Sequence, residues 1–474
     1  MLSHGLMPPL MFGGMIIVLL IGFPVAFSLS AVGLLFGLAG IATGHFSPDF
    51  LQALPFRLFG TISNELLLAI PFFTFMGAIL ERCGLAEDLL EGMGQLFGGR
   101  PGGLAFAVVI VGAILGAITG TVAASVIAMG LISLPVMLRY GYDMRLATGV
   151  IAASGTITQV IPPSLVLIVL ADQLKRSVGD MYLGAIGPSI LQVAIFLAFL
   201  AGVAFFQPAR MPPLPPEART FQGWPLIRRV LVAMVPSLGL IFLVLGTIFL
   251  GLATPTEAGA MGAVGAMLLA WLHGRLSWKL VHEGMSSTAS VTAMVIYILF
   301  GATCFSLVFQ GVDGGAWIEG LLKNLPGGQT GFLLFTNLFI FFLAFFLDFF
   351  EIAFIVIPLL APVADKLGID LIWLGLLICV NMQTSFMHPP FGFALFYLRG
   401  VAPKEVKSSD IYWGAVPWIC LQLLLVGILI MFPQSVTFWK TEESRLDNSA
   451  IEQKLNNIEA PISDDEIEIP KITR

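Results

Sequence analysis

The architecture of this chain is predicted mainly from two short stretches, Ala153-Ser-Gly-Thr-Ile-Thr-Gln-Val-Ile-Pro-Pro163 and Asn381-Met-Gln-Thr-Ser-Phe-Met-His-Pro-Pro390. Each lies inside an otherwise apolar segment and combines hydroxyl and amide side chains with paired prolines. Paired prolines remove two backbone donors and clash with the preceding turn, so a helix opens there and frees carbonyl groups. Free carbonyls in hydrocarbon need polar partners. A simple proline kink explains either stretch alone. Because the pattern occurs twice, we favour two interrupted helices with a functional role.

The segments around these stretches are typical of a protein embedded in a bilayer. Of 474 residues, 57% are hydrophobic and 11% are charged, and the mean hydropathy is +0.95. Soluble globular domains carry about 25% charged residues, so a soluble enzyme, a nucleic-acid-binding protein and a secreted module are excluded. Apolar segments lie near residues 8–27, 28–44, 64–81, 146–171, 182–206, 228–250, 256–273, 287–310, 371–398 and 411–433. The chain is therefore predicted to be an all-α polytopic membrane protein.

The C-terminal residues 441–474 differ from the rest of the chain. They hold nine acidic and four basic residues, a net charge of −5 out of the formal −6 of the whole chain. Because they show no sustained apolar periodicity, we predict a solvated, disordered acidic tail. The membrane-embedded part is then nearly neutral.

Two further apolar segments, 104–138 and 331–365, are too long for one helix. Each has a polar or glycine-rich midpoint, Thr119-Gly120-Thr121 in the first and Asp348 in the second. Each is either two crossings or one re-entrant helical hairpin. Treating both as re-entrant places most basic connections on one side, including 207–229 with its four arginines, and the positive-inside rule makes that side cytoplasmic. Only the connection 172–180, which carries Lys175 and Arg176, departs from this scheme.

This topology has ten crossings and places both termini in the periplasm. Single cysteines that replace Ser47 and Ser449, in a background without the four native cysteines, are therefore expected to react with a membrane-impermeant thiol reagent added outside. Labelling of both positions only after the membrane is opened would overturn the topology.

The two halves of the chain resemble each other. Shifting residues 135–163 by 227 positions gives 7 identities in 29 positions, including the paired prolines, where composition alone gives about two. The pattern Asp180-x-Tyr182-x-Gly184-Ala185 also recurs at Asp410-x-Tyr412-x-Gly414-Ala415. We predict a first repeat at 1–215 and a second at 216–440, each with five spanning helices, a hairpin and an interrupted helix. An odd number of crossings inverts the second repeat, and inverted repeats are typical of secondary transporters.

The interrupted helices supply the candidate chemistry. Hydroxyl, amide and carbonyl oxygens at such breaks suit Na⁺, and half-helix N-termini suit a carboxylate. The 227 shift pairs Thr121 with Asp348, Ser154 with Asn381 and Thr158 with Ser385. Asp348 is the strongest ion-site candidate, because a carboxylate among phenylalanines demands a partner; a structural pair or a protonated acid is the alternative. The candidate substrate-binding residues are Ser154, Pro162, Pro163, His388, Pro389 and Pro390.

Other functions have no support in the sequence. No phosphate-binding loop is present, so ATP-driven transport by this chain is not expected. There is no H-E-x-x-H motif, no compact Ser/His/Asp set and no C-x-x-C pair, so we expect neither an enzyme nor a metal centre or other cofactor. Glu257, which follows a Thr-Pro break, is interpreted equally well as a helix-start carboxylate or as a polar site residue.

Several collinear motifs, taken together, resemble the large membrane subunit of tripartite ATP-independent periplasmic (TRAP) transporters, the DctM-like family. They are Gly116-Ala-Ile-Thr-Gly-Thr-Val-Ala-Ala-Ser125, Gly155-Thr156 to Pro162-Pro163-Ser164, Ala253-Thr-Pro-Thr-Glu-Ala258, Leu347-Asp348 with Pro358 and Pro362, and Asn381 to Gly392. The resemblance runs from about residue 8 to residue 433.

The resemblance implies an elevator-type importer of the bacterial inner membrane. It implies two partners, a small four-helix membrane subunit and a periplasmic binding protein that delivers a small organic acid, with Na⁺ as the coupling ion. Carried over by motif, Thr119, Gly120 and Thr121 with Gly155 and Thr156 frame one Na⁺ site. Asp348, Asn381 and Ser385 frame the other. The second break departs from the common family pattern at Thr384, Ser385 and His388.

Two alternatives stay open from the sequence. One is a stand-alone Na⁺-coupled carboxylate symporter of related inverted-repeat architecture, which needs no binding protein. The other is a membrane scaffold or receptor that acts through the acidic tail, and deletion of 441–474 separates it from a transporter.

Overall fold

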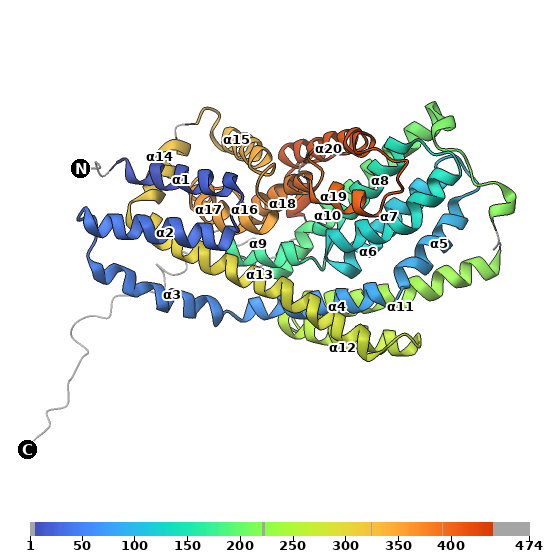
Figure 1. The fold of residues 1–474 in the computed structure, drawn as a ribbon, viewed down its shortest axis with the longest axis horizontal. Helices are drawn as coiled ribbons and strands as arrows, with labels where there is room; N and C mark the ends of the chain where they lie inside the picture. Colours follow the sequence, from blue (N-terminus) through green and yellow to red (C-terminus); the bar gives the residue numbers. More distant parts are fainter. Residues whose placement is uncertain (1–4, 220–222, 324, 391, 439–474) are drawn as a thin grey trace, which may run out of the picture.

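The computed structural model describes residues 5–219, 223–323, 325–390 and 392–438, and the predicted acidic tail lies outside them. Within these residues every regular element is a helix (Figure 1). Large apolar side chains cover much of the outer surface, as expected where the solvent is lipid. The prediction of an all-α polytopic membrane protein is confirmed.

Six of the described helices are long and apolar enough to cross a membrane. They are α2 (Val25–Ala42), α7 (Val122–Arg139), α10 (Val178–Phe206), α11 (Trp224–Phe249), α13 (Trp278–Gly311) and α20 (Ser408–Met431). A seventh is formed if the pair Pro48–Ile62 and Glu65–Arg82, bent by 49°, is one span. The remaining predicted spans fall on α1 (Met7–Ile21), on α12 (Pro255–Leu272) and on the two interrupted segments. The total of ten crossings stays a prediction.

Both interrupted helices break where the paired prolines predict. In the first, α8 (Met144–Thr156) passes into a 3₁₀ turn, Ile157–Gln159, and the chain resumes as α9 (Leu165–Gln173). In the second, α18 (Leu371–Met382) passes into a turn, Gln383–Phe386, and resumes as α19 (Phe393–Val401). Both proline–proline bonds are cis.

The two long apolar segments fold as helices joined by short turns. In the first, α6 (Gly103–Thr119) and α7 meet at Gly120, whose φ of 62° is left-handed and favours glycine. In the second, α15 (Gly328–Leu343) is followed by α16 (Phe349–Ile355) and α17 (Ile357–Lys366), with Asp348 at the turn.

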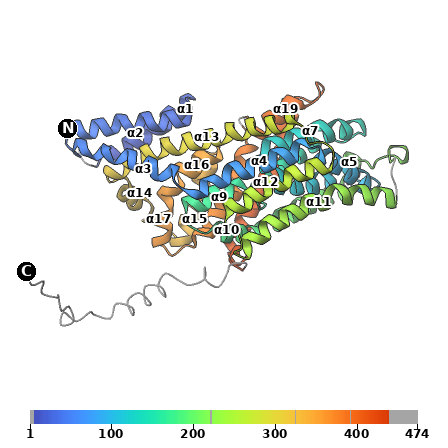
Figure 2. The same cartoon turned by 90° about the horizontal axis from the view of Figure 1, so that it is seen from below.

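The helices form two packed groups. The long helices α2, α11, α12 and α13 pack with α4 (Ala69–Arg82) along one side of the molecule (Figures 1 and 2). The interrupted helices lie in the other group, where α20 packs on α8 and α10 packs on α18. The last long helix of each predicted repeat therefore packs on the interrupted helix of the other repeat. The helix-start interpretation of Glu257 is confirmed, since it forms a capping box with Thr254 at the start of α12.

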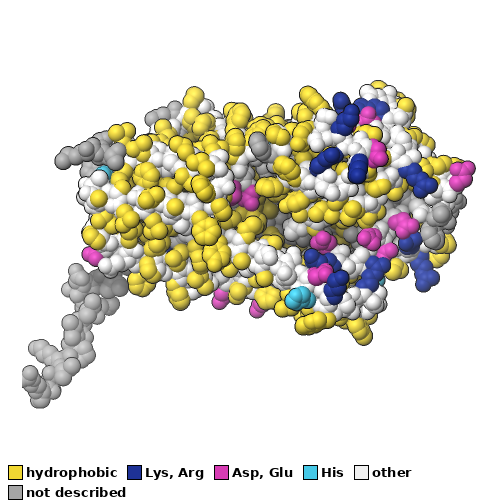
Figure 3. Space-filling view, in the orientation of Figure 1, with side chains coloured by type: hydrophobic (Ala, Val, Ile, Leu, Met, Phe, Trp, Pro, Cys, Tyr) yellow, Lys and Arg dark blue, Asp and Glu magenta, His cyan; other side chains and the backbone are white. Residues whose placement is uncertain are grey.

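Basic side chains gather at one end of the face shown in Figure 3, and α1 begins at the opposite end (Figure 1). Helix α5 (Leu85–Phe97) lies at the first of these ends (Figure 1), and its Asp88 pairs with Arg229 (3.6 Å) and Arg275 (3.1 Å). This grouping agrees with the assignment of the basic connections, including 207–229, to one side of the membrane.

Candidate functional site

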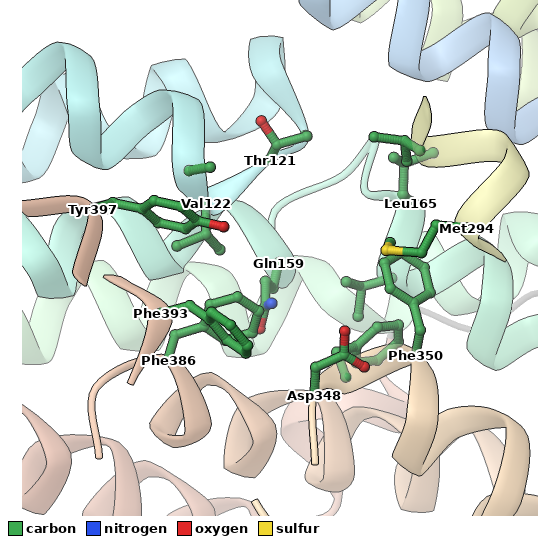
Figure 4. Close-up of a pocket in the computed structure, with 15 residues that line it drawn as sticks. Thr121, Val122, Gln159, Leu165, Met294, Asp348, Phe350, Phe386, Phe393 and Tyr397 are labelled. Atoms are coloured by element: carbon green, nitrogen blue, oxygen red, sulfur yellow. The ribbon is translucent and has the colours of Figure 1, made fainter. Parts of the chain in front are cut away.

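A cavity of about 310 Å³ lies where the two hairpins and the two helix breaks meet. Gly120 and Thr121 line it from the turn of the first hairpin, and Asp348 lines it from the turn of the second. The side chain of Gln159, from the first break, lies between Thr121 and Asp348 (Figure 4). Most of the remaining wall is apolar, so these few polar groups determine what the cavity binds.

Four helices begin at the wall of this cavity. They are α7, α9, α16 and α19, whose first residues, together with the capping residues Thr121 and Asp348, are among those that line it. A helix N-terminus presents backbone N–H groups and the positive end of the helix dipole, so it favours negative charge nearby. At α16 the carboxylate of Asp348 already supplies the negative charge that the positive end of the helix dipole favours. The other three N-termini leave the cavity suited to an anionic ligand.

Asp348 is fixed by its own helix start. Its Oδ1 accepts a hydrogen bond from the backbone N–H of Glu351 (2.9 Å), and Glu351 Oε2 accepts from the backbone N–H of Asp348 (2.9 Å). This reciprocal capping box holds both carboxylates in place. Both also line a neighbouring cavity of about 560 Å³, bounded by the start of α2 and by α13. Asp348 thus lines two cavities, one towards the helix breaks and one towards the long helices.

The residues predicted for the first Na⁺ site separate into two places. Gly120 and Thr121 line the cavity, whereas Gly155 and Thr156 are buried behind it in α8. The Thr156 hydroxyl donates to a backbone carbonyl of its own helix (2.8 Å). Thr119 ends α6, and its side chain is outside the part of the chain that is described.

The residues predicted for the second Na⁺ site also have different surroundings. Asp348 lines the cavity, but the Asn381 amide donates to the backbone carbonyl of Asn337 on α15 (2.6 Å). The Ser385 hydroxyl donates to the backbone carbonyl of Met382, the last residue of α18 (2.6 Å). Neither Asn381 nor Ser385 is among the residues that line the two cavities.

The predicted substrate-binding residues lie mainly in the packed core. Ser154 is fully buried against Gly112 of α6. The ring of His388 is 1% exposed and stacks on Phe345, with 4.0 Å between ring centroids. Pro162 and Pro163 are buried, Pro389 is half-buried and Pro390 is exposed. None of these six residues lines the cavity.

Sequence reasoning missed two polar groups of the cavity, Gln159 and Tyr397. Gln159 stands within the quoted first break, and its position three residues before the paired prolines was a signal for it. Tyr397 lies on α19 after the second break, in an aromatic run where nothing distinguishes it from its neighbours. Asn337, the partner of Asn381, was also missed, because a single amide within α15 carries no pattern.

Comparison with known proteins finds one transporter family and several of its members. Residues 12–435 match the family described as the DctM component of tripartite ATP-independent periplasmic transporters. The C4-dicarboxylate TRAP transporter large permease protein DctM of Pseudomonas aeruginosa is 30% identical over 84% of this chain and 91% of its own length. The isethionate TRAP transporter permease protein DctMQ of Oleidesulfovibrio alaskensis is 28% identical, over 91% of this chain and 66% of its own.

A solved structure shares the fold at lower sequence identity. The YdaH transporter of Alcanivorax borkumensis matches with a TM-score of 0.57 and 16% identity, over 81% of this chain and 88% of that one. At this identity the likeness supports the fold alone.

Proposed function

The chain belongs to the DctM family of tripartite ATP-independent periplasmic transporter components, and we propose that it is the translocation subunit of a Na⁺-coupled, binding-protein-dependent importer of small organic acids. It is a multi-pass membrane protein whose relatives are transporter permeases. The basic connections and the bacterial relatives support a place in the bacterial inner membrane.

One observation carries the proposal: three helix N-termini and a fourth capped by Asp348 converge on a cavity of about 310 Å³. The N-termini of α7, α9 and α19 suit a carboxylate. The Asp348 carboxylate and the neighbouring neutral oxygens suit a hard cation of low charge such as Na⁺. A bound cation offsets part of the negative charge that the Asp348 carboxylate and an anionic ligand place in the low-dielectric interior, which favours joint transport.

The partners follow from the family. The description of the family is tripartite, and the DctMQ relative is longer than the part that this chain matches. We therefore propose a small membrane subunit and a periplasmic binding protein as partners. Two packed helix groups with the cavity against α13 support an elevator movement of the group that holds the helix breaks. The substrate class rests on relatives named for C4-dicarboxylate and isethionate transport.

The test is uptake by purified protein in liposomes. The chain is reconstituted with its small membrane subunit, and uptake of labelled C4-dicarboxylates and other organic acids is measured with the binding protein outside. Uptake is expected only with an inward Na⁺ gradient and with the binding protein present, and without ATP. Uptake in Na⁺-free buffer, or uptake that requires ATP, would contradict the proposal. Uptake without the binding protein would instead support the stand-alone symporter.

A further inference from the structure

Four polar side chains meet in the core of the group that holds the helix breaks. Gln192, Gln383, Gln422 and Thr156 come from four different elements, and each is at most 1% exposed. Gln383 Oε1 accepts from Gln192 Nε2 (2.6 Å) and from Gln422 Nε2 (3.0 Å). Gln383 Nε2 donates back to Gln192 Oε1 (3.1 Å). Gln422 Nε2 also donates to Thr156 Oγ1 (3.3 Å). We call these four residues the glutamine network.

The glutamine network joins the two helix breaks. Thr156 is the last residue of α8, directly before the first break, and Gln383 begins the turn of the second. The bridging residues Gln192 and Gln422 lie on the long helices α10 and α20. The connection therefore runs from one break to the other through side chains alone.

The network also follows the internal repeat. The offset of 230 that superimposes Asp180-x-Tyr182 on Asp410-x-Tyr412 places Gln192 on Gln422. The offset of 227 that superimposes the paired prolines places Thr156 on Gln383. Each long helix thus supplies a glutamine at the same position, and both glutamines reach the second break.

Buried amides of this kind constrain movement. A side-chain amide in a core without water must find partners within the protein, and a change that separates it from them leaves donors and acceptors unpaired. A shift of one helix break relative to the other would separate at least one of these hydrogen-bonded pairs. The network therefore favours a single relative position of the two breaks.

We propose that the glutamine network is a positioning device that holds the two helix breaks in fixed register and so couples the oxygen groups of the two predicted Na⁺ sites. The proposal rests on the proposed function and deepens it, because it assigns a role to residues that line neither cavity. Ordering of the first break by Na⁺ would then pre-order the second, which is positive cooperativity between sites.

The network is asymmetric, and this gives a matched control. Gln422 contacts both Gln383 and Thr156, and its loss separates the first break from the second. Gln192 contacts Gln383 and not Thr156, and its loss leaves the link between the breaks intact. The two glutamines match in residue type, burial and repeat position. A purely structural role predicts equal effects of replacing them, whereas the coupling role predicts unequal effects.

The experiment measures uptake against Na⁺ concentration for the wild type, Gln422→Met and Gln192→Met, each reconstituted with both partners. For Gln422→Met we expect the half-saturating Na⁺ concentration to rise about 5- to 10-fold and the Hill coefficient to fall towards one. For Gln192→Met we expect less than about a twofold change at an unchanged Hill coefficient. The thermal stability of each purified variant with and without Na⁺ gives a second readout that does not depend on uptake.

A third variant, Gln422→Asn, tests the proposal if Gln422→Met folds poorly. Gln422→Asn keeps the amide but shortens the side chain, so it does not reach Gln383 and Thr156 together, and the same loss of cooperativity is expected. Equal shifts in the Gln192 and Gln422 variants, or unchanged Na⁺ dependence in the Gln422 variants, would overturn the coupling proposal alone. If neither the uptake nor the thermal stability of the wild type depends on Na⁺, both the coupling proposal and the proposed function are overturned.

Discussion

Uptake by the variant Asp348→Asn is expected to require about a hundredfold more Na⁺ for half-maximal rate than uptake by the wild type. A single negative charge close to a bound Na⁺ contributes about 4 kcal/mol at an effective dielectric constant of 20, and each 1.4 kcal/mol is a factor of ten. The substituted asparagine side chain would still offer an oxygen, so part of the binding is retained. The measurement is initial uptake against Na⁺ concentration, normalised to folded protein.

The same substitution should leave the fold intact. Asp348 starts α16, and its Oδ1 accepts the backbone N–H of Glu351. Asparagine is as good a helix-capping residue as aspartate, and its side-chain oxygen can accept the same hydrogen bond. Expression and thermal stability without Na⁺ are therefore expected to match the wild type. If the charge of Asp348 served folding alone, the reverse would be expected, with poor folding and normal Na⁺ dependence.

Two control variants isolate the effect of the charge. Asp370 caps α18 by accepting the backbone N–H groups of Ile372 and Trp373, and it lines neither cavity. Asp370→Asn removes an equivalent capping charge and should leave Na⁺ dependence unchanged. Thr121→Ala removes a neutral oxygen from the opposite wall of the cavity, worth about 0.5–1.5 kcal/mol. This variant should raise the half-saturating Na⁺ concentration about 2- to 10-fold. Unchanged half-saturation in Asp348→Asn would remove this residue from the ion site.

The parts of the site that the sequence predicts are those with a local physical cause. Paired prolines in the interior of a helix interrupt it, and both breaks lie where Pro162 and Pro389 place them. Gly120 marks a turn because its φ is positive. Asp348 attracts notice because a carboxylate is costly among phenylalanines. Each of these inferences needs only a few neighbouring residues.

The parts that the sequence does not predict depend on contacts between distant segments. Asn381 was grouped with Asp348 by resemblance, yet its amide contacts Asn337, 44 positions earlier in the chain. Gln383 contacts Gln192, 191 positions away. A single polar residue in an apolar helix shows that a partner is needed, but the partner is identified only once the packing of α10, α15 and α20 is known.

The close contacts that glycines allow between helices are also not predictable from the sequence alone. The repeat match includes Gly184 and Gly414 without giving a reason for either. In the structure a Cβ at Gly414 would lie 2.3 Å from the backbone oxygen of Arg145 on α8. A Cβ at Gly149 would lie 2.1 Å from the backbone oxygen of Gly414. The backbones of α8 and α20 thus approach each other closely, as small residues allow in membrane proteins.

The variant Gly414→Val is therefore expected to abolish most folded protein, because its side chain would force α20 away from α8 and separate Gln422 from Thr156. Gly414→Ala should be folded but less stable by about 1–3 kcal/mol, the usual effect of overpacking. The matched controls are Gly427→Val and Gly427→Ala on the same helix, where a Cβ meets nothing within 4 Å. Yield of monodisperse protein in detergent and its melting temperature are the measurements. Equal losses at both positions would show that helix flexibility, and not the approach of α8 to α20, explains why glycine occupies position 414.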